Sequence, residues 1–167
     1  IAAILVTGSF SQGKQEYSVT LRDGWFLQAA AKVTAKGEEI SKPGFAAANW
    51  HPALVPGTVL GSLVHDKVYQ AIYVGKNFER IPAEPFQGAW WYRTEFVPAE
   101  DPGHNVFRLE FDGINYRANI WLNGKPVAGA DKVAGAFRRF DFDITGLVKA
   151  GVQNALAVAG FPPKPGD

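Results

Sequence analysis

Short runs in which apolar and polar residues alternate recur along this chain and constrain its fold more than any other feature. The apolar positions in three of these runs are Tyr17, Val19 and Leu21; Phe107, Leu109 and Phe111; and Phe140, Phe142 and Ile144. A period of two places the apolar side chains on one face of a β-strand. The 18 Gly and 11 Pro are scattered along the sequence, which favours many short strands joined by turns and little helix. We therefore predict an all-β chain in which two antiparallel sheets form a β-sandwich.

Local signals mark turns and strand ends within this pattern. Asn123-Gly124 favours a type I′ hairpin turn, since both positions of that turn need a positive φ. A helical turn capped by Asp143 or Thr145 is expected before Val148, and another single helical turn is expected at Leu60–Val64. Asn154–Ala159 is the expected last strand, because the prolines that follow Phe161 cannot continue a hydrogen-bonded ladder.

The length of 167 residues fits one domain. Its expected parts are a lead-in at residues 1–16, the sandwich at 17–160 and a linker toward a further domain at 161–167. Two interpretations of the apolar run Ile1–Val6 stay open: the tail of a signal peptide, or an edge strand or ordered lead-in. The sequence has no methionine, even at position 1, so we expect a processed chain or a piece of a longer one. An exported location, secreted or periplasmic, is favoured over a cytoplasmic one.

Composition argues against several classes of function. The 17 Lys and Arg and 16 Asp and Glu give a net charge of +1. These charges are interspersed, which argues against a nucleic-acid partner. No stretch approaches the roughly 18 apolar residues that span a bilayer. The absence of cysteine excludes a disulfide framework and a thiolate metal site.

Catalytic and metal-binding signatures are also missing. There is no nucleophile elbow, no phosphate-binding loop and no dinucleotide fingerprint. His51, His65 and His104 are spread without the spacing of metal ligands, so neither a metal nor another cofactor is expected.

One pair of carboxylates is compatible with hydrolytic chemistry. Asp141 and Asp143 share one face of a predicted strand about 7 Å apart, at a rise of about 3.4 Å per residue, which is near the separation of paired glycosidase carboxylates. A solvated strand face paired with Arg138 and Arg139 is the preferred interpretation, and a structural calcium site is an alternative.

The densest aromatic segment runs from Trp90 to Phe96. An aromatic ring can cover the C–H face of a sugar while polar neighbours bind its hydroxyls, so Trp90 and Trp91 are candidates for carbohydrate binding. Successive side chains of a strand point to opposite faces, so one face, holding Trp90 and Tyr92 or else Trp91, must be core. Core packing is the preferred interpretation for each of these rings. We also expect core or interdomain packing for three further indoles, Trp25, Trp50 and Trp121.

Proline and glycine interrupt the segment Ser41–Ile81, which predicts one long irregular loop of the kind that often carries function. Its last part, 66–82, combines aromatic and amide groups that suit a sugar subsite. The candidate residues are Tyr69, Tyr73, Asn77 and Glu79, beside Arg80. A solvated surface loop is an equally good interpretation of this composition.

An ordered set of short motifs extends over nearly the whole chain, from Tyr17 to Pro163. It comprises Trp25; Trp50 with Val55-Pro56-Gly57-Thr58; Asp66 and Asn77 before Ile81-Pro82; Trp90-Trp91-Tyr92-Arg93; the segment 111–118; Trp121-Leu122-Asn123-Gly124; Phe142-Asp143-Ile144-Thr145; and the segment 154–158. The ordered set resembles the N-terminal sugar-binding domain of glycoside hydrolase family 2. The segment 41–45 before Trp50 resembles the exo-β-D-glucosaminidase subgroup, while β-mannosidases and β-galactosidases share the wider pattern.

The resemblance implies a galactose-binding-like jelly roll that precedes an immunoglobulin-like domain and a (β/α)₈ barrel. In such enzymes the barrel carries both catalytic glutamates, so this chain would contain no catalytic residue. Its expected role is to pack on the barrel and to lend the loop Asp66–Ile81 to the subsite for a terminal β-linked sugar. That sugar would be glucosamine, mannose or galactose, and the carboxylate of Glu79 would suit a glucosamine ammonium. A free-standing lectin-like module and a spacer that touches no sugar remain alternative functions.

Overall fold

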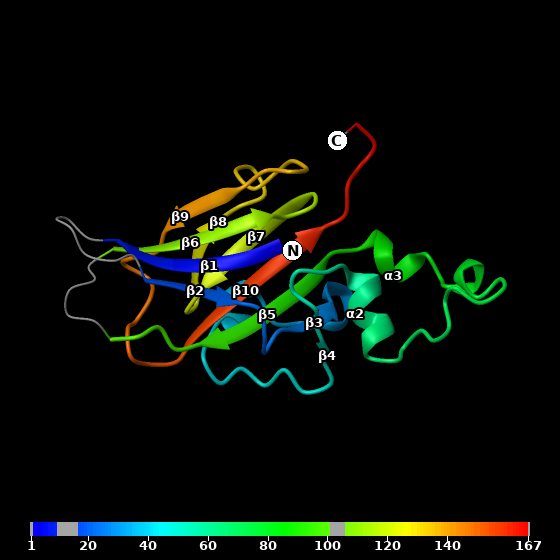
Figure 1. The fold of residues 1–167 in the computed structure, drawn as a ribbon, viewed down its shortest axis with the longest axis horizontal. Coiled ribbons are helices and arrows are strands. Elements are labelled where there is room, and N and C mark those ends of the chain that lie inside the picture. Colours follow the sequence, from blue (N-terminus) through cyan, green and yellow to red (C-terminus); the bar gives the residue numbers. More distant parts are fainter. Residues whose placement is uncertain (1, 10–16, 101–105, 167) are drawn as a thin grey trace.

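A computed structural model describes residues 2–9, 17–100 and 106–166, and within these ranges ten strands form two antiparallel sheets (Figure 1). The elements in chain order are β1 (Ala2–Ser9), β2 (Tyr17–Leu21), β3 (Phe26–Ala29), η1 (Ala30–Lys32), α1 (Gly37–Ile40), β4 (His51–Pro52), α2 (Val59–His65), η2 (Phe78–Arg80), α3 (Glu84–Gln87), β5 (Trp90–Phe96), β6 (Val106–Gly113), β7 (Arg117–Leu122), β8 (Lys125–Ala128), β9 (Phe140–Asp143) and β10 (Asn154–Phe161). The four-stranded sheet has the order β2-β1-β6-β9, and the six-stranded sheet has the order β4-β3-β5-β10-β7-β8. The predicted all-β sandwich is confirmed.

The main core lies between the two sheets and collects the inward-facing residues of both. In β6, Leu109 and Phe111 are buried while Asp112 is exposed, as the alternation predicted. From the other sheet, Leu156 and Val158 of β10 join the same cluster. Each such side chain stabilises the fold by about 1.5–3 kcal/mol when it leaves water, so this shared cluster holds the two sheets together.

Strand β1 lies within the range that the sequence analysis assigned to a lead-in. It pairs with β2 on one side and β6 on the other, with Ile4 opposite both Leu21 and Phe111. An inner strand of the sheet therefore starts before Tyr17, earlier than the expected boundary of the sandwich. An unbroken apolar run is compatible with a buried strand as well as with the end of a leader, so the sequence pattern does not separate the two.

Two predicted local structures are confirmed. Asn123 and Gly124 have φ values of 51° and 82° and join β7 to β8 as a two-residue turn. The helical turn expected at Leu60–Val64 is the longer helix α2. It starts after Thr58, whose side-chain oxygen accepts a hydrogen bond from the backbone N–H of Gly61 at 3.0 Å.

The segment after β9 forms the single capped turn that was expected, although it is too short to count as a helix. The carbonyl of Ile144 accepts hydrogen bonds from Leu147 and Val148, and the chain does not continue into a second turn. Asp143 caps this turn, because its carboxylate accepts the backbone N–H of Thr145 at 2.9 Å. Hydrogen bonds from the side chain and backbone of Thr145 lower the pKa of Asp143.

A second apolar cluster covers the outer face of the six-stranded sheet. Here Ile40 and Trp91 are buried, and Trp121 packs beside Trp91 with ring centroids 5.3 Å apart. Helix α1 begins at Gly37, where an added Cβ would lie 2.3 Å from the ring of Trp121. The segment that contains α1 therefore lies directly on the indole, and β5 is buried on both of its faces.

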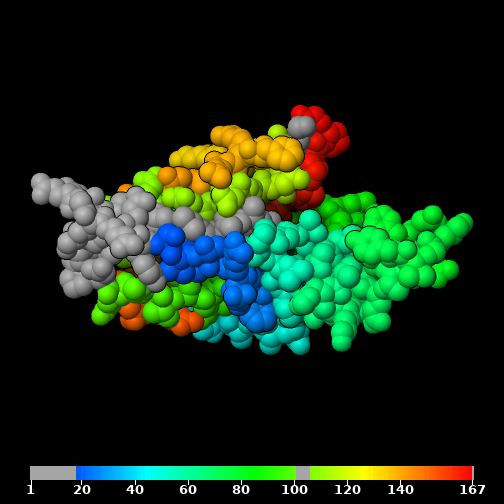
Figure 2. Space-filling model, viewed as in Figure 1, coloured from blue at the N-terminus to red at the C-terminus, as the bar shows by residue number. Residues whose placement is uncertain are grey.

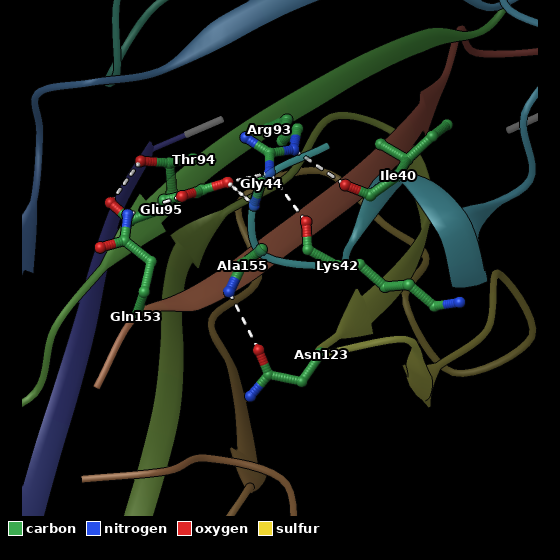
Figure 3. Close-up of polar contacts among 9 residues, drawn as sticks. All are labelled: Ile40, Lys42, Gly44, Arg93, Thr94, Glu95, Asn123, Gln153 and Ala155. Atoms are coloured by element: carbon green, nitrogen blue, oxygen red, sulfur yellow. Dashed lines mark hydrogen bonds and ion pairs between the residues drawn. The ribbon is translucent and has the colours of Figure 1, made fainter. Parts of the chain in front are cut away.

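Arg93 fixes this covering segment to the sheet (Figure 3). Its side chain is almost completely buried. Its Nε donates to the carbonyl of Ile40 at 2.8 Å, its Nη2 donates to the carbonyl of Lys42 at 2.9 Å, and the same Nη2 contacts the carboxylate of Glu95. We call these contacts the Arg93 clamp.

Glu95 extends the Arg93 clamp to two more parts of the chain. Its Oε1 accepts the backbone N–H of Gly44 at 2.8 Å, and its Oε2 accepts Nε2 of Gln153 at 2.6 Å. Burial alone would raise the pKa of Glu95, but the hydrogen bonds from Arg93, Gly44 and Gln153 outweigh it and lower the pKa below its usual value. The carboxylate is therefore stabilised in its charged form.

The start of β10 is held by a buried amide. Asn154 is fully buried, and its Nδ2 donates to the carbonyls of Lys149 and Val152, both at 2.7 Å. Its Oδ1 accepts from Lys149 N and from Nδ2 of Asn123. Asn123 also accepts the N–H of Ala155 at 3.0 Å (Figure 3). These bonds tie the β7–β8 turn to β10.

Candidate functional site

Residues 66–82, between α2 and α3, extend away from one end of the sandwich (Figure 1) and project from that end of the surface (Figure 2). We call this segment the 66–82 loop. At its base the ring nitrogen Nδ1 of His51 lies 2.7 Å from Oδ2 of Asp66, which links β4 to the end of α2. Tyr69 packs against the main core, and Ile72 is buried within the loop. The loop is thus attached to the sandwich near its start.

Internal hydrogen bonds give the 66–82 loop a defined shape. The carbonyl of Ala71 accepts the N–H of Val74 at 2.9 Å and Nδ2 of Asn77 at 3.0 Å. Ala71 and Gly75 adopt φ values of 49° and 56°, which reverse the chain at the tip. The side-chain nitrogen of Asn77 thus helps to hold the loop together. Within the described residues its oxygen has no partner and can accept a hydrogen bond from a ligand.

The predicted sugar-binding residues of this loop have different environments. Tyr73 is 92% exposed at the tip, and Glu79 is exposed on η2 without a hydrogen-bond or ion-pair partner among the described residues. Tyr69 is half-buried and packs on Phe86, with ring centroids 6.3 Å apart. Tyr69 and Asn77 line the same hollow of about 260 Å³. The structure therefore brings Tyr69 and Asn77 together at one hollow, with Tyr69 also serving as packing, while Tyr73 and Glu79 are exposed elsewhere on the loop.

Trp90 and Trp91 do not offer open ring faces. They are 6% and 8% exposed, and Trp90 donates Nε1–H to the carbonyl of Pro85 at 2.7 Å. Trp90 belongs to the main core and Trp91 to the outer cluster. Stacking of sugar on these rings does not fit the structure, because both sides of β5 are covered by this same chain. The preferred interpretation of core packing explains both rings.

The other three indoles also serve packing. Trp25 is buried in the main core, where its Nε1 donates to the carbonyl of Leu21 at 3.1 Å. Trp50 and Trp121 are half-buried against the outer cluster. For Trp50 the neighbour is Phe45, in an edge-to-face arrangement with ring centroids 6.1 Å apart.

The exposed pair Asp141 and Asp143 is a solvated strand face, as preferred from the sequence. The ion-pair partner of Asp141 is Arg108 of β6, with Nε at 2.8 Å and 3.0 Å from the two carboxylate oxygens, and not Arg138 or Arg139. Strand pairing explains this partner. Strand β6 lies directly beside β9 and places Arg108 opposite Asp143, two residues along the strand from Asp141. In the part of the chain that the structure describes, no group of three or more His, Asp or Glu side chains could hold a metal ion. His104 lies outside the described residues.

A second hollow region at this end of the molecule is not predicted by the sequence. Two hollows of about 190 Å³ and 450 Å³ share Gly57, Thr58, Ile114 and Asn115 in their linings. These residues belong to two of the ordered motifs, and those motifs are the signal in the sequence that could have indicated this region. Alternation and composition did not indicate that the two motifs meet.

No helix of the described residues is long and apolar enough to cross a membrane.

The two sheets and their short connecting helices define a galactose-binding-like β-sandwich. A family model described as glycosyl hydrolase 2 galactose-binding domain-like matches residues 25–163. The chain belongs to this family of domains from glycoside hydrolase family 2.

Similar proteins agree with this assignment. An exo-β-D-glucosaminidase of Streptomyces avermitilis is 35% identical over 148 residues, which cover 89% of this chain and 16% of that protein. The crystal structure of an Amycolatopsis orientalis exo-chitosanase matches with a TM-score of 0.78 and 34% identity over 86% of this chain and 16% of that one. A β-D-mannosidase from Dictyoglomus thermophilum matches with a TM-score of 0.66 and 26% identity over 86% of this chain and 15% of that one. The chain thus spans about a sixth of each relative.

Proposed function

We propose that this chain is the non-catalytic N-terminal domain of an exo-β-glycosidase, and that its 66–82 loop completes the pocket for the terminal sugar. The parent reaction would be retaining hydrolysis by two glutamates of a barrel domain outside this sequence. Support for the parent activity comes from the exo-β-D-glucosaminidases and the β-mannosidase among the similar proteins. The chain spans only 16% of the first of these, so it corresponds to one domain of such an enzyme.

The shape of the 66–82 loop is the observation that carries the pocket role. The loop extends beyond the end of the sandwich and is held by its own hydrogen bonds to Ala71 and by the buried Ile72. A segment fixed in this way loses little conformational entropy when it meets a ligand or a neighbouring domain. The Tyr73 ring and the Glu79 carboxylate are both exposed on the loop.

The exposed groups suit an amino sugar. The ring of Tyr73 can cover the C–H face of a pyranose, and the side-chain oxygen of Asn77 can accept a hydroxyl hydrogen bond. Glu79 can accept a charge-assisted hydrogen bond from an ammonium group, which is stronger than a bond to a neutral hydroxyl. We therefore propose glucosamine at the non-reducing end of the substrate. Exo-β-D-glucosaminidases recur among the similar proteins.

Kinetics of the intact parent enzyme test this proposal. We expect Glu79→Gln to lower kcat/KM for an aryl β-D-glucosaminide by about 10-fold, the loss of roughly 1.4 kcal/mol of a charge-assisted bond. The same variant should change kcat/KM for the matching aryl β-D-glucoside by much less, because that substrate has no ammonium group. Glu39→Gln, which alters an exposed glutamate on α1, is the matched control.

Other outcomes would support the alternative functions. Unchanged kcat/KM in both Glu79→Gln and Asn77→Ala would leave only a spacer role. Measurable binding of glucosamine or a chitosan oligosaccharide by the 167-residue chain alone would instead favour a lectin-like module. We also expect this chain alone not to hydrolyse aryl β-glycosides, and turnover by it would refute the non-catalytic assignment.

A further inference from the structure

The two hollows described above form one continuous groove at the end of the sandwich near α3. The smaller hollow reaches Phe161 and Pro162 at the end of β10, and the larger reaches Ala136 and Phe137 in the β8–β9 connection. Both include Gly57, Thr58, Ile114 and Asn115. We call these eight residues the end groove.

Backbone hydrogen bonds hold the parts of the end groove side by side. Tyr116 N donates to the carbonyl of Phe161 at 3.4 Å, and Gly135 N donates to the carbonyl of Tyr116 at 3.0 Å. Ala118 N donates to the carbonyl of Val133 at 3.2 Å. The end of β10, the β6–β7 connection and the β8–β9 connection therefore form a single surface with a fixed shape.

Phe137 stands at one side of this groove with its ring in solvent. Its side chain is 104% exposed, and its φ of 57° is uncommon for a bulky residue. Arg138 fixes the turn by donating Nη1–H to the carbonyl of Ala134 at 2.8 Å, and a Cβ at Gly135 would lie 2.6 Å from Cδ of Arg138. The turn thus holds an aromatic ring outside both cores. An observed backbone outlier of this kind is a reason to look for function.

Two polar groups beside the groove are engaged within the domain. Oγ1 of Thr58 accepts the N–H of Gly61, and the carboxylate of Asp112 lies 3.3 Å from Nε of Arg139. The remaining lining is largely apolar, and its polar side chain is the exposed amide of Asn115. Its large side chains are Phe86, Trp90, Tyr92, Ile114, Phe137 and Phe161. This mostly apolar composition favours a polypeptide surface over a sugar, which would need several free hydrogen-bonding groups where the lining offers the one amide of Asn115.

We propose that the end groove is the docking surface for the polypeptide that follows this domain in the parent enzyme, with Phe137 as its aromatic anchor. The inference rests on the proposed function, because it requires a parent enzyme. The relatives are about six times longer than their match to this chain, which covers 16% of them. The described chain leaves the sandwich through Phe161 and Pro162, so the following segment is tethered beside the groove. Tethering raises the effective concentration of a docking partner to the millimolar range for short linkers.

Hydroxyl-radical footprinting of the intact parent enzyme tests the docking directly. We expect Phe137 to be oxidised as slowly as Phe111, which is buried in the main core. Oxidation of Phe137 at the rate found in the urea-unfolded enzyme would overturn the proposal. Protection of Phe137 that requires added sugar would also overturn the proposal, in favour of a glycan site. Protection that rises with protein concentration would overturn it in favour of a contact between two copies.

A variant gives a second, independent readout. Phe137→Asn removes the ring and keeps a residue that tolerates positive φ, so the domain should remain folded. In the parent enzyme we expect protease cleavage after Gly166 to become about tenfold faster, as expected when the burial of one large apolar side chain is lost. Val97→Asn, at the other end of β5 and 55% exposed, is the control. Equal cleavage rates in both variants would refute the anchor role. Glu79→Gln kinetics test the sugar pocket separately, so the two proposals can fail independently.

Discussion

The Arg93 clamp allows a quantitative prediction for the stability of the fold. Arg93→Met keeps an apolar stem of similar length but removes the donors to the carbonyls of Ile40 and Lys42 and the cation beside Glu95. Loss of one partner from a buried ion pair costs about 3–5 kcal/mol, because the other charge stays buried without compensation. The side chain of Glu95 is 19% exposed, so water can reach it and the lower limit of about 3 kcal/mol applies.

Thermal unfolding of the 167-residue chain, followed by calorimetry, measures this loss. For a domain of this size a cost of about 3 kcal/mol corresponds to a fall in Tm of about 6–12 °C. The matched control is Arg108→Met, which breaks the ion pair with Asp141. The side chains of that pair are 37% and 45% exposed. An exposed pair contributes about 0–1 kcal/mol, so its Tm should fall by less than about 4 °C.

The fall in Tm of Arg93→Met relative to that of Arg108→Met tests whether the Arg93 clamp stabilises the fold. If Arg93→Met lowers Tm no more than Arg108→Met, the buried contacts of the Arg93 clamp do not stabilise the fold in the manner described. Arg93→Lys separates charge from geometry, since lysine keeps the charge but lacks the planar fork of donors. We expect Arg93→Lys to fall between the wild type and Arg93→Met.

Two further predictions concern the same face of the six-stranded sheet. The pKa of Glu95 is lower in the folded chain, so its contribution to stability is present above its unfolded pKa of about 4.3 and is lost as the pH falls through the folded value. Glu95→Gln should therefore make the free energy of unfolding fall less than in the wild type when the pH drops below about 4.3. Urea titrations at pH 3 and pH 7 measure this difference, and an equal fall in both proteins would contradict the prediction. Gly37→Ala should cost about 1–3 kcal/mol, because the new methyl group overlaps the Trp121 ring, and an unchanged Tm would show that the indole moves aside at no cost.

The sequence predicted the elements whose signals are local. Alternation identified β6 through Leu109 and Phe111, and Asn123-Gly124 identified the β7–β8 turn. Both signals act over a few residues and do not depend on what lies elsewhere in the chain. The ordered motifs added the family, which residues 25–163 match.

The features that the sequence did not predict depend on residues that are far apart in the chain. Alternation along β5 requires one buried face, but both faces are buried because the segment around α1 covers Trp91. Similarly, the partner of Asp141 is Arg108, 33 residues away, since strand pairing and not proximity in sequence brings charges together. The 66–82 loop was found by composition, but its internal bonds and the end groove became visible only in three dimensions.

The position of β10 has a consequence for how the chain folds. Strand β10, the last of the described strands, lies between β5 and β7 in the centre of the larger sheet. Until residues 154–161 are available, β5 and β7 each expose an unpaired edge, and such edges invite association with other chains. The sheet can therefore close only after nearly the whole domain has left the ribosome. Because its central pairings are distant in sequence, we expect folding to be slow, with a period in which chaperones have unpaired edges to protect.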